Sequence, residues 1–374
     1  MNDSPDKISI ALIGDVMLDR AVGNHYRDKP NDFKLEEIAK ILRNYDVVLA
    51  NLENPVGTGG APHPKQDPNV AFRCHPDTLK ILKDIGVNIV TLANNHMLDY
   101  GEHTLLDTLT HVDNAGLMRL GAGKNYQEAN KPLTLTIKNL KLAFIGSVFL
   151  YSASTERATY RSPGVADYRI RKILAQITDL KMQGYTIIVT LHWGMEYSFF
   201  PLPYQVKQAR AMVDAGASLI LGHGPHYPQG IETYKNADIV YSVGNFIFDE
   251  PYVFSKRGFI YGTEMNSNSK LSNRRIYPFK IVNHCPVLEP KGENSRLGIF
   301  IQALDEICSR KNKAFWKDIN NIYFQDVMKR VFRMKSFKFV LLPPVSFYFS
   351  IGIKNMLKKF NLKNFIRHNN KKSS

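Results

Sequence analysis

Cysteine is scarce in this 374-residue sequence, and the three cysteines present, Cys74, Cys285 and Cys308, are far apart. Their spacing excludes a disulfide scaffold and a CxxC zinc or redox motif, and it suits a reducing compartment. Long apolar runs are also lacking. The nearest candidate, residues 339–353, has 15 uncharged residues and contains two prolines, whereas a transmembrane helix needs about 20 apolar residues.

The N-terminus lacks the features of a secretory signal peptide. It has no basic region, no long apolar stretch and no small-residue cleavage site, and it reads as the start of a strand. Together with the cysteine content, this leads us to expect a cytoplasmic protein, either free or bound peripherally at the inner face of the membrane.

Acidic residues are outnumbered, since 34 Asp and Glu stand against 49 Lys and Arg, a net charge of +15. Residues 301–374 alone contain 16 basic and 4 acidic residues, so 12 of the 15 net charges lie in the last quarter. The near-neutral remainder argues against a nucleic-acid groove through the body of the protein. The tail offers charge but no groove-reading motif, so we do not expect a nucleic-acid partner.

The C-terminal part of the chain differs from the rest in composition. We expect one domain over residues 1–295 and a basic, partly helical C-terminal extension over 296–374. Within the extension, segment 335–360 has lysines around an apolar, aromatic middle. This pattern is typical of an interfacial segment on an anionic membrane. A helix packed onto the body, with its lysines in solvent, explains the pattern equally well.

The body of the chain alternates short apolar runs with amphipathic stretches. Seven β-branched runs predict buried strands at residues 8–13, 46–50, 87–92, 140–145, 186–191, 218–221 and 239–243. Helical spacing predicts helices at residues 34–43, 76–85, 167–182, 204–215, 296–306 and 315–334. The polar stretch 266–275 predicts a loop or mobile insertion, and 276–287 a last strand or hairpin. The alternation favours a layered α/β domain.

Polar residues follow most of these strands directly. The first strand ends in Asp15, the second is followed by Glu53, and the third by Asn95 and His96; the later strands end near His192, His223, His226 and Asn245. In an open α/β sheet, ligands bind at the carboxyl ends of the strands. Oxygen ligands with several imidazoles and no thiolate suit Zn²⁺, Mn²⁺ or Fe²⁺. A pair of such ions can clamp a hydroxide and a phosphoester, and a nearby histidine can protonate the leaving group.

The strings at these positions resemble those of the CapA-type poly-γ-glutamate capsule biosynthesis family, a branch of the calcineurin-like metallophosphatase superfamily. The matching strings are GDVMLDR (14–20), NLENP (51–55), TLANNHMLDYG (91–101), HWGMEY (192–197), GHGPHYPQG (222–230) and YSVGNFIFD (241–249). They occur in the family's order over about residues 8–250. The resemblance implies a four-layer αββα metallophosphatase-like sandwich with a two-metal centre.

The resemblance also implies roles for single residues. The expected metal ligands are Asp15, Glu53, Asn95, His192, His223 and His226. His96, the neighbour of the amide ligand, is expected to act with Asp15 in catalysis, near the leaving group. The superfamily's first motif is Asp-x-His, whereas Met17 stands at the third position here, so one ion or two remain open. Asp19 or Glu196 are alternatives for the missing ligand.

Four further residues are expected to contact substrate. Arg73 follows a strand-like stretch and is placed to face an anion. Glu196 and Tyr197 lie beside His192 in sequence, and Asn245 can hydrogen-bond either substrate or loop backbone.

Two functions remain open from the sequence. The first is a metal-dependent hydrolase, phosphoesterase-like, linked to capsule or cell-surface polymer biosynthesis and acting on a phosphoester or an anionic polymer. The alternative is a non-catalytic, polyanion-binding component of a poly-γ-glutamate or capsule synthesis or export complex. In addition, the C-terminal tail is expected to contact an anionic membrane surface.

Overall fold

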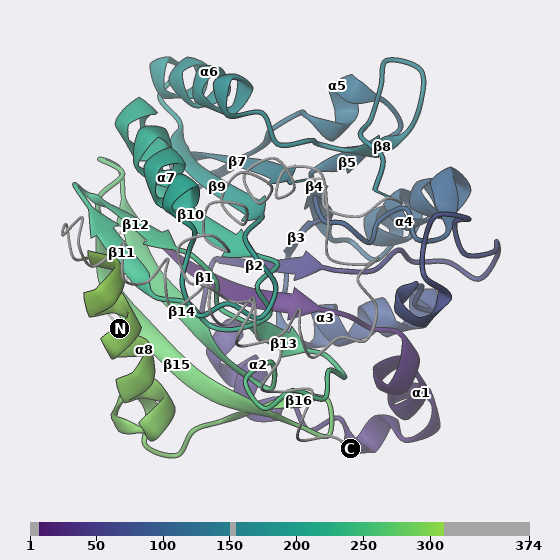
Figure 1. Cartoon of the computed structure of the whole chain (residues 1–374). Coiled ribbons are helices and arrows are strands. Elements are labelled where there is room, and N and C mark those ends of the chain that lie inside the picture. The colour runs from purple at the N-terminus through teal and green to yellow at the C-terminus, as the bar shows by residue number, and fades with distance from the viewer. Residues whose placement is uncertain (1–6, 150–154, 310–374) are drawn as a thin grey trace, which may run out of the picture. The chain divides into compact units, whose positions relative to one another are not determined.

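The computed structural model describes residues 7–149 and 155–309, which form a mixed α/β protein with two large mixed sheets (Figure 1). The α-helices are α1 (Arg20–Asp28), α2 (Glu36–Leu42), α3 (Leu79–Ile85), α4 (Gly101–Asn114), α5 (Tyr126–Ala129), α6 (Ile170–Met182), α7 (Pro203–Ala215) and α8 (Arg296–Ser309). Short 3₁₀ helices are η1 (Pro30–Asp32), η2 (Pro68–Val70), η3 (Pro76–Thr78) and η4 (Gly292–Asn294).

The strands fall into three sheets. The first has the order β16-β15-β14-β1-β2-β3-β4, with β13 also paired to β1, and comprises β1 (Lys7–Val16), β2 (Val47–Leu52), β3 (Ile89–Thr91), β4 (Met118–Leu120), β13 (Asn245–Ile247), β14 (Arg257–Asn266), β15 (Leu271–Val282) and β16 (Cys285–Leu288). The second has the order β11-β12-β10-β9-β7-β6 and comprises β6 (Leu133–Ile137), β7 (Leu140–Val148), β9 (Thr186–His192), β10 (Ala217–His223), β11 (Ile231–Tyr234) and β12 (Ala237–Val240). A small third sheet pairs β5 (Ala122–Gly123) with β8 (Gly164–Val165).

Three apolar cores lie between the two large sheets and between each sheet and its helices. Side chains of β1 alternate between two of them, because successive residues of a strand point to opposite faces. Ala11 and Ile13 pack with α2, α3 and α4 in one core, whereas Ile10 and Leu12 meet residues of β9 and β10 in a second core between the large sheets. The third core joins the outer face of the second sheet to α6 and α7.

All seven predicted strands are present, as β1, β2, β3, β7, β9, β10 and β12, although β12 begins and ends earlier than expected. The helices predicted at 34–43, 76–85, 167–182 and 204–215 correspond to α2, η3 with α3, α6 and α7. The predicted helix at 315–334 and the segment 335–360 lie outside the described residues.

The prediction of a loop at residues 266–275 was wrong. β14 runs to Asn266 and pairs antiparallel with β15, which starts at Leu271, so only a short turn separates the strands. The Asn266 side chain holds this turn by accepting hydrogen bonds from the backbone N–H groups of Asn268 and Lys270. The polar composition of this segment resembles that of a loop because this end of the hairpin is largely exposed, and an exposed strand needs few apolar side chains.

Helix α8 packs onto the body of the protein beside β11 and β15 (Figure 1). Leu297 and Ile301 are buried in the core between the two sheets, and Asp305 accepts a hydrogen bond from the backbone of Ile231 at 2.6 Å. Across residues 7–149 and 155–309, no helix has the length and apolar character needed to cross a membrane.

Candidate metal centre

The strand ends bring the predicted ligands together. β1, β2 and β3 run parallel in the first sheet, and β9 and β10 run parallel in the second. Asp15 lies near the end of β1, Glu53 directly follows β2, and His192 and His223 are the last residues of β9 and β10. All four side chains are buried.

The close approach of two backbone segments fixes the position of Asp15. The Asp15 N–H donates to the carbonyl of Gly244 at 3.2 Å, just before β13 pairs with β1. A Cβ on Gly14 would lie 1.8 Å from that carbonyl oxygen. Only glycine therefore permits this approach, which brings Asp15 beside Asn245 in the paired strands.

Two carboxylates and three imidazoles meet at this edge. His223 Nδ1 lies 2.9 Å from Asp15 Oδ1, and His226 Nδ1 lies 3.5 Å from Asp15 Oδ2. Glu53 Oε1 lies 3.9 Å from His192 Nε2 and 3.8 Å from His226 Nε2. One ligand atom each from Asp15, Glu53 and His192 lies within 4.8 Å of the others, so this group could hold a metal ion.

Two asparagines that the sequence reading left out organise the carboxylates. Asn51 Nδ2 donates to Asp15 Oδ1 at 2.9 Å and to Glu53 Oε2 at 3.2 Å. Asn94 Nδ2 in turn donates to Asn51 Oδ1 at 3.0 Å and fixes the orientation of that amide. One oxygen of each carboxylate is thus held by the protein while the other is left to face the centre.

Several buried side-chain atoms at this centre have no hydrogen-bond partner in the described part of the chain, and this observation fits a metal site. Among the described residues, the buried atoms with no hydrogen-bond partner include Asp15 Oδ2, Glu53 Oε1, Asn95 Oδ1 and His223 Nε2. Leaving a buried polar atom unpaired costs about 1–3 kcal/mol, so a cluster of four calls for a ligand. All four atoms belong to predicted metal ligands, and each is a donor atom that a divalent transition-metal ion accepts.

The electrostatics of the cluster are those of a cation site. Burial, followed by the charge of Asp15, raises the pKa of Glu53 well above its usual value. Burial opposes ionisation of Asp15 too, but the hydrogen bond from His223 and the nearby imidazole of His226 outweigh it and hold the pKa of Asp15 well below its usual range. Burial lowers the pKa of His192 to about 3, so its imidazole is neutral and able to bind a metal.

His226 and Asn245 form a pair within the centre. His226 Nδ1 lies 2.8 Å from Asn245 Oδ1, which leaves Nε2 as the ring nitrogen facing Glu53. Burial would lower the pKa of His226, but the carboxylates of Glu250 and Glu53 raise it well above its usual value. Asn245, expected to contact substrate, therefore orients a predicted ligand.

His96 is held by a carboxylate of its own. His96 Nδ1 lies 2.7 Å from Asp99 Oδ2, which also accepts the backbone N–H of Phe72 at 2.9 Å. The ring of Phe72 packs on the imidazole with centroids 4.2 Å apart. Since an ionised carboxylate only accepts, Nδ1 carries the proton toward Asp99, and Nε2 is the nitrogen left for proton exchange.

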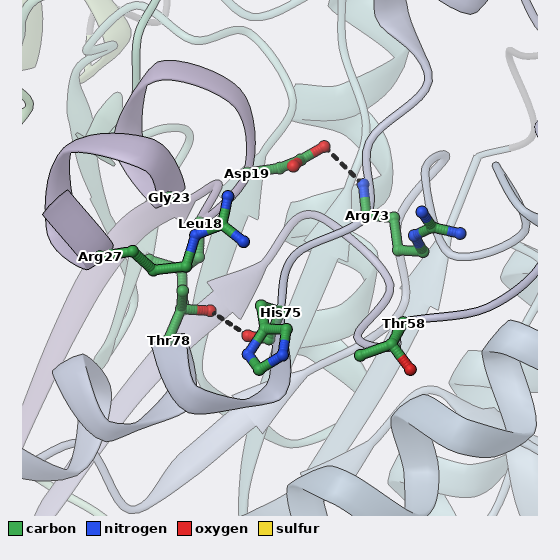
Figure 2. Close-up of a pocket in the computed structure, with 9 residues that line it drawn as sticks. Leu18, Asp19, Gly23, Arg27, Thr58, Arg73, His75 and Thr78 are labelled. Carbon is green, nitrogen blue, oxygen red and sulfur yellow. Dashed lines mark hydrogen bonds between the residues drawn. The ribbon is translucent and has the colours of Figure 1, made fainter.

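Met17, two residues after Asp15, belongs to an apolar core. Its side chain is fully buried in the core between the first sheet and its helices, and its sulfur lies 3.2 Å from the backbone nitrogen of Asp19. Asp19, one alternative for the missing ligand, uses Oδ2 to accept the backbone N–H of Arg73 at 2.7 Å (Figure 2). Glu196, the other alternative and an expected substrate contact, is exposed.

Arg73 lines a separate hollow of about 250 Å³ (Figure 2). Its guanidinium donates to the carbonyls of Gly59 and Gly60 and lies 4.2 Å from the ring centroid of Tyr100. These contacts hold the loop that follows Glu53. An anion approaching Arg73 would share a guanidinium that already has these partners.

Tyr197 lies beside the centre, as expected from its place after His192. Its ring is 5.8 Å from that of His226, and its hydroxyl donates to Glu250 Oε1 at 2.8 Å. Burial raises the pKa of this hydroxyl, so it stays protonated. Glu250 Oε2 is buried with no hydrogen-bond partner in the described structure, and the sequence reading did not single this residue out.

Comparison with known proteins places the sequence of this chain in a family. Residues 9–250 match the bacterial capsule synthesis protein family PGA_cap. The chain belongs to this family. It is 33% identical over 256 residues to the capsule biosynthesis protein CapA of Bacillus anthracis, and 33% identical over 248 residues to the PGA biosynthesis protein CapA of Bacillus subtilis. These matches span 67% and 66% of this chain but only 62% and 65% of the relatives.

Solved structures resemble the chain more distantly. The NAD nucleotidase of Haemophilus influenzae aligns over 86% of this chain and 67% of its own, at 12% identity and a TM-score of 0.44. A putative 5'-nucleotidase from Staphylococcus aureus aligns over 84% of this chain and 58% of its own, at 13% identity and a TM-score of 0.45.

Proposed function

We propose that this chain is a metal-dependent hydrolase of the metallophosphatase type that acts in the synthesis of a capsule or another cell-surface polymer. The observation that carries the proposal is the set of buried, unpartnered ligand atoms on Asp15, Glu53, Asn95 and His223. We infer that the two large sheets and their outer helices form a four-layer αββα sandwich, which the three separate cores support.

The donor set fits two divalent ions, Mn²⁺, Zn²⁺ or Fe²⁺, better than one. Asp15, Glu53 and His192 account for a first ion, and the further buried donors are Asn95, His223 and His226. Bound ions would supply a Lewis acid and activate water for attack on a phosphoester. Asn51 would keep the two carboxylates oriented, and burial would exclude bulk water from the reacting groups.

His96 is the residue we assign to proton transfer. Its Nδ1 donates to Asp99, so a proton on Nε2 is the one available to the leaving-group oxygen. Asp99 stabilises the imidazolium and fixes the ring. The substrate class we propose is a phosphoester or an anionic polymer. The buried free thiols of Cys74 and Cys285 support work in a reducing compartment.

Metal content and turnover together test the proposal. We expect about two ions per chain by elemental analysis of the wild-type protein, and fewer in His223→Ala. His103→Ala, an exposed histidine on α4 whose side chain is 84% exposed, is the matched control and should keep the metal. His96→Ala should keep the metal and lose hydrolysis of a nitrophenyl phosphodiester.

Two results would overturn parts of this assignment. Full turnover in His192→Ala and His223→Ala would show that the centre lies elsewhere. Failure to take up Mn²⁺ or Zn²⁺ would remove the hydrolase proposal. If purified protein then retained poly-γ-glutamate without shortening it, the chain would be a polyanion-binding component of the synthesis complex.

A further inference from the structure

Three consecutive large apolar side chains stand in solvent just after β13. Tyr252, Val253 and Phe254 are 52%, 65% and 40% exposed, whereas the other exposed large apolar side chains of the described residues are not consecutive. Contiguous exposed apolar surface on a folded protein marks an interaction site far more often than scattered apolar residues do.

Two of these side chains, Tyr252 and Phe254, pack against aromatic rings of the protein. The Phe254 ring packs edge-on against Phe199 at 4.8 Å between centroids and also contacts Tyr227 and Phe300 of α8. The Tyr252 ring lies 5.0 Å from Tyr197. The apolar tip is therefore packed against a layer of aromatic rings.

A basic hollow adjoins this tip. The Arg257 guanidinium lies 5.8 Å from the ring centroid of Phe254, and Arg257 pairs across the strands with Lys280. Arg257, Lys280 and Lys291 line a hollow of about 370 Å³, in which Glu289 supplies one opposing charge by pairing with Lys280 at 2.8 Å. Within the described structure, Lys291 forms no ion pair, so the hollow keeps positive charge for an external anion.

We propose that this basic aromatic face, made of Tyr252, Val253, Phe254, Arg257, Lys280 and Lys291, docks on an anionic lipid surface. Aromatic and aliphatic side chains enter the boundary between headgroups and acyl chains, and lysine and arginine beside them bind lipid phosphates. Charge complementarity and the adjacency of an apolar tip to a basic hollow favour a lipid surface over a purely apolar protein partner.

The face also has a defined relation to the candidate metal centre. From the tip, Tyr252 contacts Tyr197, and Tyr197 packs beside His226. Docking through this face would hold the candidate metal centre close to the lipid surface. The docking itself does not rest on the proposed hydrolysis.

Vesicle flotation with the full-length protein tests the proposal. The probe is a vesicle of phosphatidylcholine with 30% phosphatidylglycerol, and pure phosphatidylcholine is its neutral counterpart. We expect the double variant Val253→Asp/Phe254→Asp to lower partitioning to the anionic vesicles at least tenfold. Lys291→Gln should lower it about fivefold, because a basic residue near such a surface contributes about 1 kcal/mol.

Matched controls separate this face from general effects. Met182→Asp, at a side chain 77% exposed on α6, should float as the wild type does, since it is an apolar residue outside the face. The single variant Val253→Asp, at the most exposed of the three side chains, should keep its melting temperature and metal content and still float less than the wild type, so its defect would be separate from any failure of the fold or of the metal centre. In the variant Val253→Trp, brominated lipid should quench the fluorescence of the new tryptophan, which reports insertion of this side chain into the lipid.

Three outcomes would overturn the proposal. Unchanged flotation of the double variant would show that the face does not carry binding. Equal binding to neutral and anionic vesicles would contradict the role of the basic hollow. A change from dimer to monomer in the double variant, with flotation unchanged, would identify the face as a contact between two copies of the chain.

Discussion

Replacing Glu53 by glutamine separates the role of this residue in the fold from its role in metal binding. In the metal-free protein, burial and the charge of Asp15 disfavour ionisation of the Glu53 carboxyl, and a glutamine amide has nearly the same shape. We therefore expect the metal-free variant to unfold within about 1 kcal/mol of the wild type, because the amide keeps the hydrogen-bonding shape and the Glu53 contacts to His192 and His226 are long, at 3.9 and 3.8 Å.

The response to metal should differ strongly. At a free Mn²⁺ concentration 100 times the dissociation constant, binding adds about 2.7 kcal/mol to the stability of the wild type. If the loss of one charged ligand weakens binding 100-fold, the same concentration equals the dissociation constant and adds about 0.4 kcal/mol. With roughly 2 °C per kcal/mol for a protein of this size, the melting temperature should rise about 5 °C in the wild type and about 1 °C in Glu53→Gln.

Differential scanning calorimetry after chelator treatment, followed by Mn²⁺ titration, provides the measurement. Glu232→Gln is the matched control, since Glu232 is also a buried carboxylate but pairs with Arg210 at 2.7 Å and accepts from the Tyr241 hydroxyl at 2.7 Å. This variant should lose stability without metal and keep the full metal response. An equal metal response in Glu53→Gln and the wild type would refute the assignment of Glu53 as a ligand.

Three other perturbations probe the surroundings of the centre. Asp99→Asn should lower phosphodiester turnover at least about 100-fold while metal content stays at the wild-type level, since it removes the carboxylate that orients His96; unchanged turnover would argue against this pairing. Gly14→Ala should lower the free energy of unfolding by about 3 kcal/mol or more in thermal melting, because the new methyl group would overlap the Gly244 carbonyl. Gly59→Ala is the control and should melt like the wild type, because a methyl group there meets nothing within 4 Å. Burial raises the pKa of Asp305 to about 7, so the contribution of this carboxyl to stability is greatest below pH 4 and falls as the pH rises to 7. Asp305→Asn should therefore raise the free energy of unfolding, measured with urea, by about 2–4 kcal/mol at pH 8 and leave it unchanged at pH 4. Equal effects at both pH values would contradict this interpretation.

Much of the fold could be predicted because its signals are local. Strands buried on both faces read as continuous apolar runs, and α6 and α7 carry an apolar stripe at helical spacing. The strand or hairpin predicted at residues 276–287 matches the end of β15 and β16, but β14 and the start of β15 escaped. Residues 271–275 are exposed or half-exposed, so neither an apolar run nor a clear alternation appears there. Pairing with β1 and β15, rather than local propensity, makes β14 a strand.

The candidate centre shows where sequence reasoning stops. Ligand types and strand ends pointed to the candidate metal-binding group, because parallel strands end at a common edge. Asn51, Asn94 and Asp99 stood inside the same motif strings, yet nothing in the strings separates an amide that binds metal from one that orients a carboxylate. That distinction depends on which atoms already have partners. The side-chain amides of Asn51 and Asn94 donate hydrogen bonds to neighbouring side chains, whereas the side-chain oxygen Oδ1 of Asn95 is buried and has no hydrogen-bond partner in the described structure.

The same criterion explains why Met17 is compatible with a metal centre. The Met17 thioether is packed among the apolar side chains of the core beside the first sheet. His226 instead approaches from the loop after β10, with a φ of +59° that is uncommon for a non-glycine residue. Its Nδ1 is bound to Asn245 and its Nε2 faces Glu53. The backbone strain at His226 thus places one imidazole where the sequence of the first strand supplies none, and such strain persists only where surrounding contacts hold it.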